Sequence, residues 1–203
     1  LFVRDVDVDY PSLVKARREL FAERGLTAET HYIASTGVEG SHVDPAAKVV
    51  MDAYAISGIQ PEQIEYLTAP EHLSPTQIYG VTFERGVSIA YRDRKHLILS
   101  GTASIDKNGE IVHPGNVSQQ FDRTVENLGA LLRSAGARLT DLCALIVYVR
   151  DPSDHGLAWA RVREYFGDVP TQIVVSSVCR PGWLIEIEGV AIIPSENSEL
   201  PAF

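Results

Sequence analysis

Runs of β-branched residues and one-sided apolar stripes follow one another along the second half of the chain, and they predict strands and helices in turn. Val, Ile and Thr are frequent in 80–91 and in 97–105, which predicts two strands. The next four residues, Asp-Lys-Asn-Gly at 106–109, are typical of a hairpin turn, because Asn and Gly tolerate the positive φ that tight turns require.

Two amphipathic helices are predicted after this turn. The first begins at the N-cap Asn116, with Gln119 three residues later, and stops near Gly136. Its apolar stripe is Phe121, Val125, Leu128 and Leu132, and the stripe of the second helix is Trp159, Val162 and Phe166. A one-sided stripe must pack against another element, and we expect that element to be a sheet.

Part of the chain occurs twice. Residues 2–5 match 148–151, and a helical stretch that ends at Phe21 parallels one that ends at Phe166. Further along, 30–35 parallels 171–176, and 49–56 parallels 185–192. Each copy predicts the order strand, helix, strand, strand. A fold assignment that overlooked this repeat would be wrong for the whole chain.

Together these patterns predict an α+β protein in which two helices pack on one face of a mixed β-sheet. Residues 77–194 form a complete unit in the order β-β-(β)-α-β-α-β-β, and 1–58 form the rear half of a second, degenerate unit. Three prolines among polar residues mark 59–76 as a linker, and 195–203 is a tail. A half unit leaves sheet edges unpaired, so we expect the natural gene product to carry the missing front half upstream.

Composition narrows the class of function. With 45% hydrophobic and 22% charged residues, the chain is typical of a globular protein. Its formal charge of −9 opposes attraction to a phosphate backbone, so no nucleic-acid partner is expected. No apolar run approaches the roughly 20 residues that cross a bilayer, so we expect a cytoplasmic protein without a membrane partner.

Cysteine and histidine usage gives no sign of a metal or another cofactor. The two cysteines, Cys143 and Cys179, are too few for a disulfide scaffold. The chain has no C-x-x-C pair and no H-E-x-x-H motif, and its six histidines follow no ligand spacing. We therefore expect neither bound metal nor cofactor.

Several segments in order resemble the YjgF/RidA (Rid) superfamily, and the resemblance covers 77–194. They are HLILSGTASID (96–106), FDRTVENLGALLRSAGA (121–137), LIVYVRD (145–151), PTQIVVSSV (170–178) and LIEIEGVAI (184–192). The resemblance implies a YjgF/RidA-like, chorismate-mutase-like sandwich that forms a homotrimer or pseudo-trimer with a small-molecule pocket at each subunit interface. It also implies hydrolysis of enamines or imines, whereas the label endoribonuclease L-PSP, carried by some members, fits poorly with the negative charge.

One position departs from the deaminating members of that superfamily. They hold the substrate carboxylate with an arginine two residues after the proline that opens the penultimate strand. Here Pro170 is followed by Thr171 and then Gln172. The amide of Gln172 can bind substrate through one or two hydrogen bonds but cannot form the bidentate clamp of a guanidinium, which argues against ordinary imine deamination.

A second group within the superfamily fits better. The segment VCRPGWLIEIEG (178–189) resembles the final hairpin of the chorismatases, two-unit relatives that cleave the enolpyruvyl ether of chorismate. The resemblance implies that Cys179 lines the pocket and that Glu186, seven residues later, is catalytic. The segment YGVTFERG (79–86) resembles the entry strand of the same group, which makes Tyr79 and Arg85 substrate-binding candidates.

The residues themselves add an argument for Glu186. Glu186 and Glu188 leave the same face of a strand, which on alternation alone describes a solvated face as readily as a site. Between the two copies, however, Val50 takes the place of Glu186, while Asp52 keeps the acid of Glu188. An acid kept in both copies is expected to be architectural, and one present only in the complete copy to be functional.

The chemistry of enol-ether or enamine hydrolysis needs a carboxylic acid that is protonated near pH 7, and Glu186 is our candidate. Arg85 and Arg180 are the candidates for holding an anionic substrate, although either can equally be a surface arginine. Cys179 has no histidine beside it to form a thiolate, so we expect it to line the pocket. The small residues 100–102 indicate either a close approach of ligand to backbone or a β-bulge.

We therefore expect a hydrolase that acts on a small carboxylated metabolite by enol-ether or enamine/imine hydrolysis. Two other functions stay open at this point. One is a Rid-like protein that binds a regulatory ligand without catalysis, and the other is the endoribonuclease or translation inhibitor of the older labels.

Overall fold

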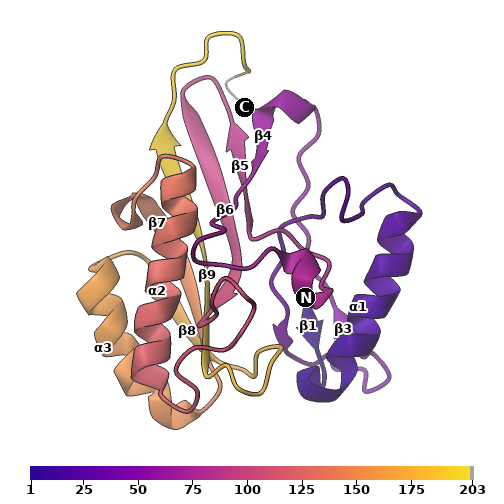
Figure 1. The fold of residues 1–203 in the computed structure, drawn as a ribbon, viewed down its shortest axis with the longest axis vertical. Helices are drawn as coiled ribbons and strands as arrows, with labels where there is room; N and C mark the ends of the chain where they lie inside the picture. Colours follow the sequence, from indigo (N-terminus) through magenta and orange to yellow (C-terminus); the bar gives the residue numbers. More distant parts are fainter. Residues whose placement is uncertain (202–203) are drawn as a thin grey trace.

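The computed structural model describes residues 1–201, except for the side chains of Gln77 and Tyr79 (Figure 1). Within this part of the chain, strands form a six-stranded sheet of order β4-β5-β6-β9-β7-β8 and a three-stranded sheet of order β2-β1-β3. The bounds are β1 Phe2–Val3, α1 Val6–Ala22, β2 Val38–Glu39, β3 Val49–Val50, β4 Ile64–Tyr66, β5 Gly86–Ala90, β6 Arg94–Ala103, α2 Val117–Ser134, β7 Leu142–Val149, α3 His155–Phe166, β8 Thr171–Val175 and β9 Ile185–Pro194. Short 3-10 helices occupy Pro61–Gln63, Thr76–Tyr79, Leu139–Asp141 and Pro152–Asp154.

Two helices cover one face of the larger sheet, as the sequence predicts. Helix α2 packs against β6 and β9, and α3 packs against β7 and β8 (Figure 1). The sheet is mixed because β7 and β8 run parallel, whereas β9 is antiparallel to both β6 and β7. All four residues of the predicted α2 stripe are buried in the core between helix and sheet.

The predicted helix start is confirmed in detail, and one core residue is corrected. Asn116 is the N-cap of α2, and its side-chain oxygen accepts a hydrogen bond from the backbone N–H of Gln119 at 3.0 Å. On α3, Val162 and Phe166 are buried, but Trp159 is 38% exposed, and the guanidinium of Arg163 lies over its ring. An indole that is covered by a neighbouring cation on the same helix does not need the sheet as a partner.

The first 50 residues repeat the topology of the last part of the complete unit. In each case the strand before the helix pairs in parallel with the next strand and antiparallel with the last one. The register also agrees, because Phe2 faces Val50 across its pair and Tyr148 faces Glu186. Val50 therefore occupies the place of Glu186 in three dimensions.

The second strand of the first copy lies later in the chain than the sequence comparison places it. Val38, not a residue of 30–35, pairs with Phe2, just as Val174 pairs with Tyr148. With this change, 38–50 corresponds to 174–186 without a gap. The segment 30–35 instead runs beside Glu84, whose side-chain oxygen accepts a hydrogen bond from the N–H of Tyr32 at 2.7 Å.

The stretch 59–76, expected as a linker, contributes to the large sheet. Its strand β4 pairs antiparallel with β5 at one edge, with Ile64 opposite Ile89. Further along the same stretch, Leu67 and Leu73 are fully buried. The prolines limit regular structure in this segment, but its apolar side chains are buried in the core.

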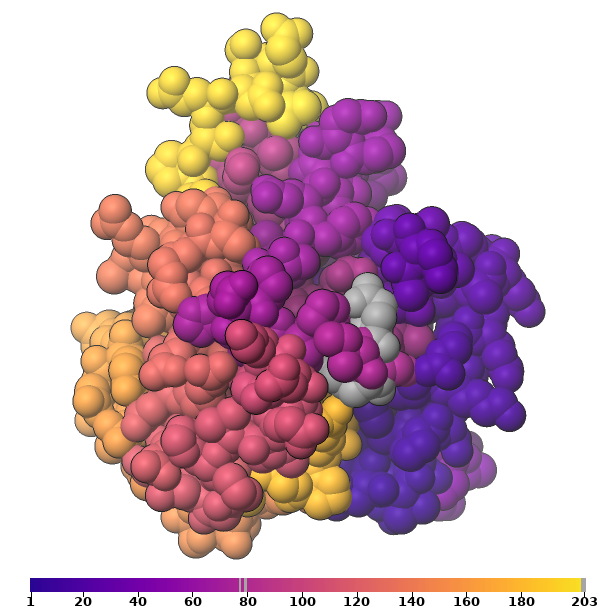
Figure 2. Space-filling model, in the orientation of Figure 1, coloured from indigo at the N-terminus to yellow at the C-terminus, as the bar shows by residue number. Residues whose placement is uncertain are grey.

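The first unit packs against the face of the large sheet that α2 and α3 leave open. Figure 2 shows it as one side of the molecule, in contact with the rest. The guanidinium of Arg150, just after β7, forms an ion pair with Asp7 of α1 at 2.8 Å. Throughout the described residues, every helix is too short or too polar to traverse a bilayer.

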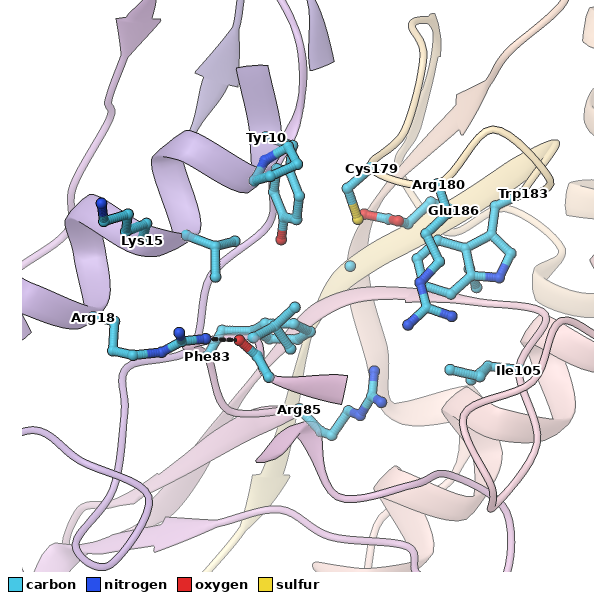
Figure 3. A pocket seen from close by; sticks show the side chains of 16 residues that line it. Tyr10, Lys15, Arg18, Phe83, Arg85, Ile105, Cys179, Arg180, Trp183 and Glu186 are labelled. Carbon is cyan, nitrogen blue, oxygen red and sulfur yellow. Dashed lines mark hydrogen bonds between the residues drawn. The ribbon is translucent and has the colours of Figure 1, made fainter. Parts of the chain in front are cut away.

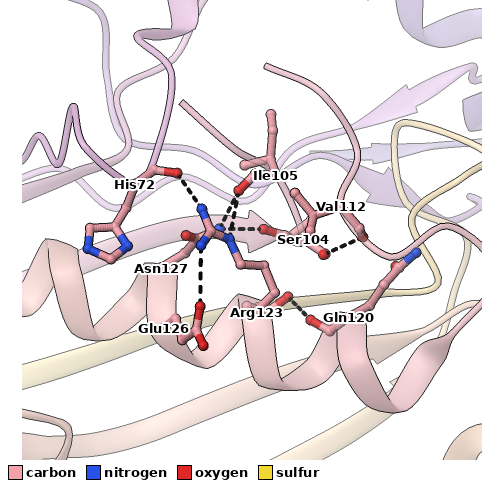
Figure 4. A network of polar contacts seen from close by, with 10 residues as sticks. His72, Ser104, Ile105, Val112, Gln120, Arg123, Glu126 and Asn127 are labelled. Atoms are coloured by element: carbon pink, nitrogen blue, oxygen red, sulfur yellow. Dashed lines mark hydrogen bonds and ion pairs between the residues drawn. The ribbon is translucent and has the colours of Figure 1, made fainter. Parts of the chain in front are cut away.

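Polar side chains of α2 bind the backbone at the end of β6 (Figure 4) and just before β9. The side-chain amide of Asn127 donates to the carbonyls of Ala103 and Ile105 at 3.1 and 3.0 Å. The buried amide of Gln120 donates to the carbonyl of Gly182 at 3.0 Å and accepts from the N–H of Leu184 at 2.9 Å. These bonds hold in place the two strand ends that carry the site described next.

Candidate functional site

Glu186 lies near the start of β9, in the middle of the large sheet, between Ala103 of β6 and Tyr148 of β7. Its neighbours Ile185 and Ile187 point toward the helices and are fully buried. By strand alternation the carboxyl group points to the opposite face, where the first unit covers it. As a result Glu186 is only 3% exposed.

A β-bulge in β6 makes room for this carboxyl group. The register of β6 against β9 shifts between Leu99 and Thr102. A Cβ on Gly101 would lie 2.0 Å from Oε1 of Glu186, so only glycine fits while the carboxyl group stays where it is. The first unit holds the bulge, because Thr36 Oγ1 accepts a hydrogen bond from the Gly101 N–H at 2.9 Å. Of the two alternatives given for 100–102, a close approach of ligand to backbone or a β-bulge, the bulge is present.

Glu186 and Gly101 line a cavity of about 280 Å³ between the two units (Figure 3). Helix α1, the segment that leads into β5, strand β6, and the β8–β9 loop each supply part of its wall. The lining residues are Tyr10, Pro11, Val14, Lys15, Arg18, Gly80, Val81, Phe83, Arg85, Gly101, Ala103, Ile105, Cys179, Arg180, Trp183 and Glu186. This volume is at the small end of ligand sites and suits a small metabolite.

Two guanidinium groups point toward one another on one side of this cavity (Figure 3). Arg85 is 5% exposed, donates to the carbonyl of Ser74 at 3.0 and 3.3 Å, and lies over the ring of Phe83. Arg180 donates to the carbonyl of Gly109 at 2.9 Å and lies over the ring of Trp183. Two converging cations in a small cavity favour an anionic ligand between them.

Burial raises the pKa of Glu186 to about 8, and the charge of Glu188 adds to this effect. The positive charge of Arg85 acts in the opposite direction but does not cancel the loss of hydration. At pH 7 such a group is protonated in a ratio of roughly ten to one. The cavity therefore contains a neutral carboxylic acid beside two cations.

Glu188 does not enter this cavity. It lines a larger one of about 970 Å³ on the same face of the sheet, where its Oε1 accepts a hydrogen bond from the hydroxyl of Tyr148 at 2.8 Å. Asp52, which corresponds to Glu188 in the first copy, lines the same larger cavity. The two acids of β9 thus interact through charge and face separate spaces.

Cys179 is half-buried and lies beside the hydroxyl of Tyr10. Burial, and then the charge of Glu186, raise the pKa of the thiol to about 12. A thiol with that pKa carries almost no thiolate at neutral pH and is a poor nucleophile. This agrees with the pocket-lining position expected for Cys179.

The structure brings four of the six candidate residues together. Arg85, Cys179, Arg180 and Glu186 line the smaller cavity. Gln172 is exposed on β8, opposite Ile146, and lies outside this cavity. The side chain of Tyr79 lies outside the described part of the chain.

Several lining residues were not predicted from the sequence. Tyr10, Val14 and Arg18 recur every fourth residue along α1, which indicates one helix face but not what the face meets. Phe83 and Trp183 carry aromatic rings beneath the two arginines, a contact without a sequence signal. Across the described residues, no group of three or more His, Cys, Asp or Glu is placed to hold a metal ion.

The repeat shows which site residues the first copy lacks. In the gapless correspondence of 38–50 with 174–186, Val43, Asp44, Ala47 and Val50 stand where Cys179, Arg180, Trp183 and Glu186 stand in the complete unit. All four differ, although the backbone pairing is the same. The differences fall on the residues that face the cavity.

Sequence comparison places the chain among known proteins. Residues 84–193 match the family described as endoribonuclease L-PSP, which is the YjgF/RidA superfamily. The chain belongs to this family. A RutC family protein of Pyrococcus abyssi is 36% identical over 98 residues, which are 47% of this chain and 76% of the relative. A RutC family protein of Pyrococcus horikoshii is 36% identical over 107 residues, 51% of this chain and 84% of the relative.

Solved structures agree on the fold of this Rid family member. A chorismatase superposes with a TM-score of 0.73 at 19% identity and covers 94% of this chain. This chain spans only 62% of the length of that chorismatase. RidA from a Psychrobacter species superposes with a TM-score of 0.52 at 18% identity and covers 64% of this chain and 99% of its own length.

Proposed function

We propose that this protein is a hydrolase of a small carboxylated metabolite that contains an enol ether, with Glu186 as the proton donor. The observation that carries the proposal is the neutral, buried carboxylic acid of Glu186 in a small cavity with two facing guanidinium groups. Arg85 and Arg180 hold the carboxylate of the substrate, which places its unsaturated carbon near Glu186.

The reaction needs one proton and one water molecule. Glu186 gives its proton to the terminal CH₂ carbon, and the π electrons form the new C–H bond while the ether oxygen stabilises the cation. Water then forms a C–O bond to the cationic carbon and passes a proton to the Glu186 carboxylate. The hemiketal releases the alcohol when its C–OR bond breaks and the hydroxyl proton moves to the leaving oxygen. The net products are a 2-keto acid and an alcohol.

Three features favour this reaction over the alternatives within the family. Gln172 replaces the arginine that the deaminating members use, and it lies outside the cavity. A cavity of about 280 Å³ and a formal charge of −9 are unfavourable for an RNA strand. The likeness to a chorismatase spans both units, whereas the likeness to RidA covers 64% of the chain.

The test uses chorismate as the probe and measures pyruvate. We expect pyruvate release by the 203-residue chain, and a loss of at least about 100-fold in kcat for Glu186→Gln, which keeps the shape but cannot donate the acid proton. Glu164→Gln, on the exposed side of α3, serves as the matched control and should retain full activity.

Two results would count against the proposal. Chorismate that binds without pyruvate release would indicate a ligand-binding Rid protein instead. Pyruvate release by Glu186→Gln at the rate of the unmodified protein would remove Glu186 as the proton donor.

A further inference from the structure

The hydroxyl group of Tyr10 reaches the same cavity from the first unit. Tyr10 lies on α1, and its Oη points into the cavity from the side opposite Arg85 and Arg180 (Figure 3). Lys15 and Arg18, on the same helix, also line the cavity, and the guanidinium of Arg18 donates to the carbonyl of Gly80. Tyr10 is the uncharged polar group among these three, and its hydroxyl interacts with the charge of Glu186.

Backbone packing fixes the ring of Tyr10. A Cβ on Gly37, in the segment before β2, would lie 3.0 Å from Cε2 of Tyr10 and 3.8 Å from its Oη. The tyrosine ring therefore rests directly on the glycine backbone, while the hydroxyl lies beside the thiol of Cys179. Burial, followed by Cys179 and Glu186, raises the pKa of Tyr10, so it stays a neutral hydroxyl that can both donate and accept hydrogen bonds.

A neutral hydroxyl at this position has a use in the proposed hydrolysis. Once the two arginines hold the substrate carboxylate, the side of the substrate away from them faces Tyr10. After Glu186 has given up its proton, its carboxylate accepts one hydrogen of the attacking water. A second acceptor that takes the other hydrogen fixes the orientation of the water, so that its lone pair points at the cationic carbon.

We propose that Tyr10 is a positioning residue, whose hydroxyl orients the attacking water on the side of the substrate opposite Arg85 and Arg180. This inference rests on the proposed function. It also assigns a role to the first unit, which has lost the Glu186 position but supplies the hydroxyl that completes the site of the second unit.

Tyr10→Phe tests this role, because it removes only the hydroxyl and keeps the ring on Gly37. The reaction is run in D₂O with chorismate, and both pyruvate and the deuterium content of the unreacted chorismate are measured. If water attack is impaired, the protonated substrate returns its proton before it is hydrolysed. We expect pyruvate release to fall by at least about 10-fold while deuterium enters the CH₂ group of the recovered chorismate.

Two reference proteins make the result specific. Tyr165→Phe removes a hydroxyl on α3 that donates to Asp122, outside the cavity, and should match the unmodified protein. Glu186→Gln should show neither pyruvate nor deuterium, because protonation itself is lost.

Two results would overturn the role of Tyr10 and leave the proposed function intact. One is pyruvate release by Tyr10→Phe at the rate of the unmodified protein. The other is a loss of pyruvate release with no deuterium in the recovered chorismate, which would show that protonation is lost as well and that the hydroxyl only maintains the pocket. A lack of pyruvate from the unmodified protein would instead overturn the proposed function, and the role of Tyr10 with it.

Discussion

Glu186 and Glu188 are two residues apart on one strand and share one face, yet their environments differ. Glu186 faces the cavity of about 280 Å³ and makes close contact with Gly101. Glu188 faces the larger cavity and accepts the hydroxyl hydrogen of Tyr148. A strand pattern can show that two acids share a face, but what lies above each acid depends on residues far away in the sequence.

The raised pKa of Glu186 makes the stability of the protein depend on pH. Its pKa is about 8 in the folded chain against an ordinary value of 4.5, so the folded state binds more protons than the unfolded state between these values. The free energy of unfolding therefore falls as pH rises from about 4.5 to 8. We expect Glu186→Gln to lose this dependence. Measured by urea unfolding, the free energy of unfolding should drop between pH 5 and pH 9 by a few kcal/mol more in the unmodified protein than in Glu186→Gln. Parallel pH profiles for the two proteins would contradict this.

The same pKa sets the pH profile of catalysis. Because Glu186 must be protonated to act, we expect kcat/KM for chorismate to be level below about pH 8 and to fall about tenfold per pH unit above it. Steady-state rates between pH 6 and 10 measure this. A rate that rises through pH 8 would mean that the ionised carboxylate is the active form, and Glu186 would then be a base.

Gly101 allows a sharp test of the site geometry. Gly101→Ala would place a methyl carbon on Oε1 of Glu186, and the carboxyl group would have to move. We expect kcat for chorismate to fall by at least about 10-fold, since displacements of about 1 Å are costly in catalysis. Gly156→Ala is the control, because nothing lies within 4 Å of a Cβ there. Full activity of Gly101→Ala would show that the carboxyl position is not critical.

At the scale of elements, length decides what sequence patterns can predict. Helix α2 has 18 residues, so its apolar stripe repeats over several turns and predicts both the helix and its buried face. Strand β2 has only two residues and carries no periodicity, so the sequence comparison aligns 30–35 with β8 instead. The segment 30–35 has strand-like composition, but its partner is Glu84, which lies in the complete unit.

The polar side of α2 gives a prediction about how elements support the site. Gln120→Ala would leave the carbonyl of Gly182 and the N–H of Leu184 without this partner, next to the wall residue Trp183. We expect a loss of roughly 2–3 kcal/mol in urea unfolding and a raised KM for chorismate. Asn116→Ala removes only the N-cap and should cost about 1 kcal/mol with KM unchanged. Equal KM values for the two variants would contradict a supporting role for Gln120.

At the scale of the molecule, each unit has an arginine at the equivalent position, and this arginine holds the loop between the last two strands of the unit. Arg4 donates to the carbonyls of His42, Asp44 and Ala47. Arg150 donates to those of Val178, Arg180 and Trp183, which correspond to them one by one. This scaffold is kept in both copies, while the cavity residues it supports differ.

The site forms where the two units meet, which limits what the sequence alone could predict. Comparison of the copies singles out Glu186, because Val50 replaces it on the same backbone position. The same comparison cannot place α1 over the sheet of the other unit, so it gives no signal for Tyr10. The acid is thus predictable from the repeat, whereas the opposite wall of the cavity is a property of the packing between units.

Arg150 connects the β8–β9 loop of the complete unit to the first unit, because it binds the loop carbonyls and also contacts α1 through Asp7. The pair with Asp7 is partly exposed, so Asp7→Asn should cost no more than about 1 kcal/mol in urea unfolding. Arg150→Met removes three charge-assisted bonds to carbonyls as well, and we expect a loss of roughly 3 kcal/mol or more. Because two of these carbonyls belong to Arg180 and Trp183, KM for chorismate should rise.

Arg4→Met distinguishes an effect on stability from an effect on the site. Arg4 makes the equivalent bonds in a loop that supplies no residue to the cavity. We expect it to lower the free energy of unfolding while KM for chorismate changes much less than in Arg150→Met. If Arg4→Met raised KM as much as Arg150→Met, the bonds from Arg150 to the loop would affect KM only through the overall stability of the protein. If Arg150→Met unfolded at the same urea concentration as Asp7→Asn, the three carbonyl bonds would contribute nothing measurable, and the ion pair with Asp7 would be the functional part of Arg150.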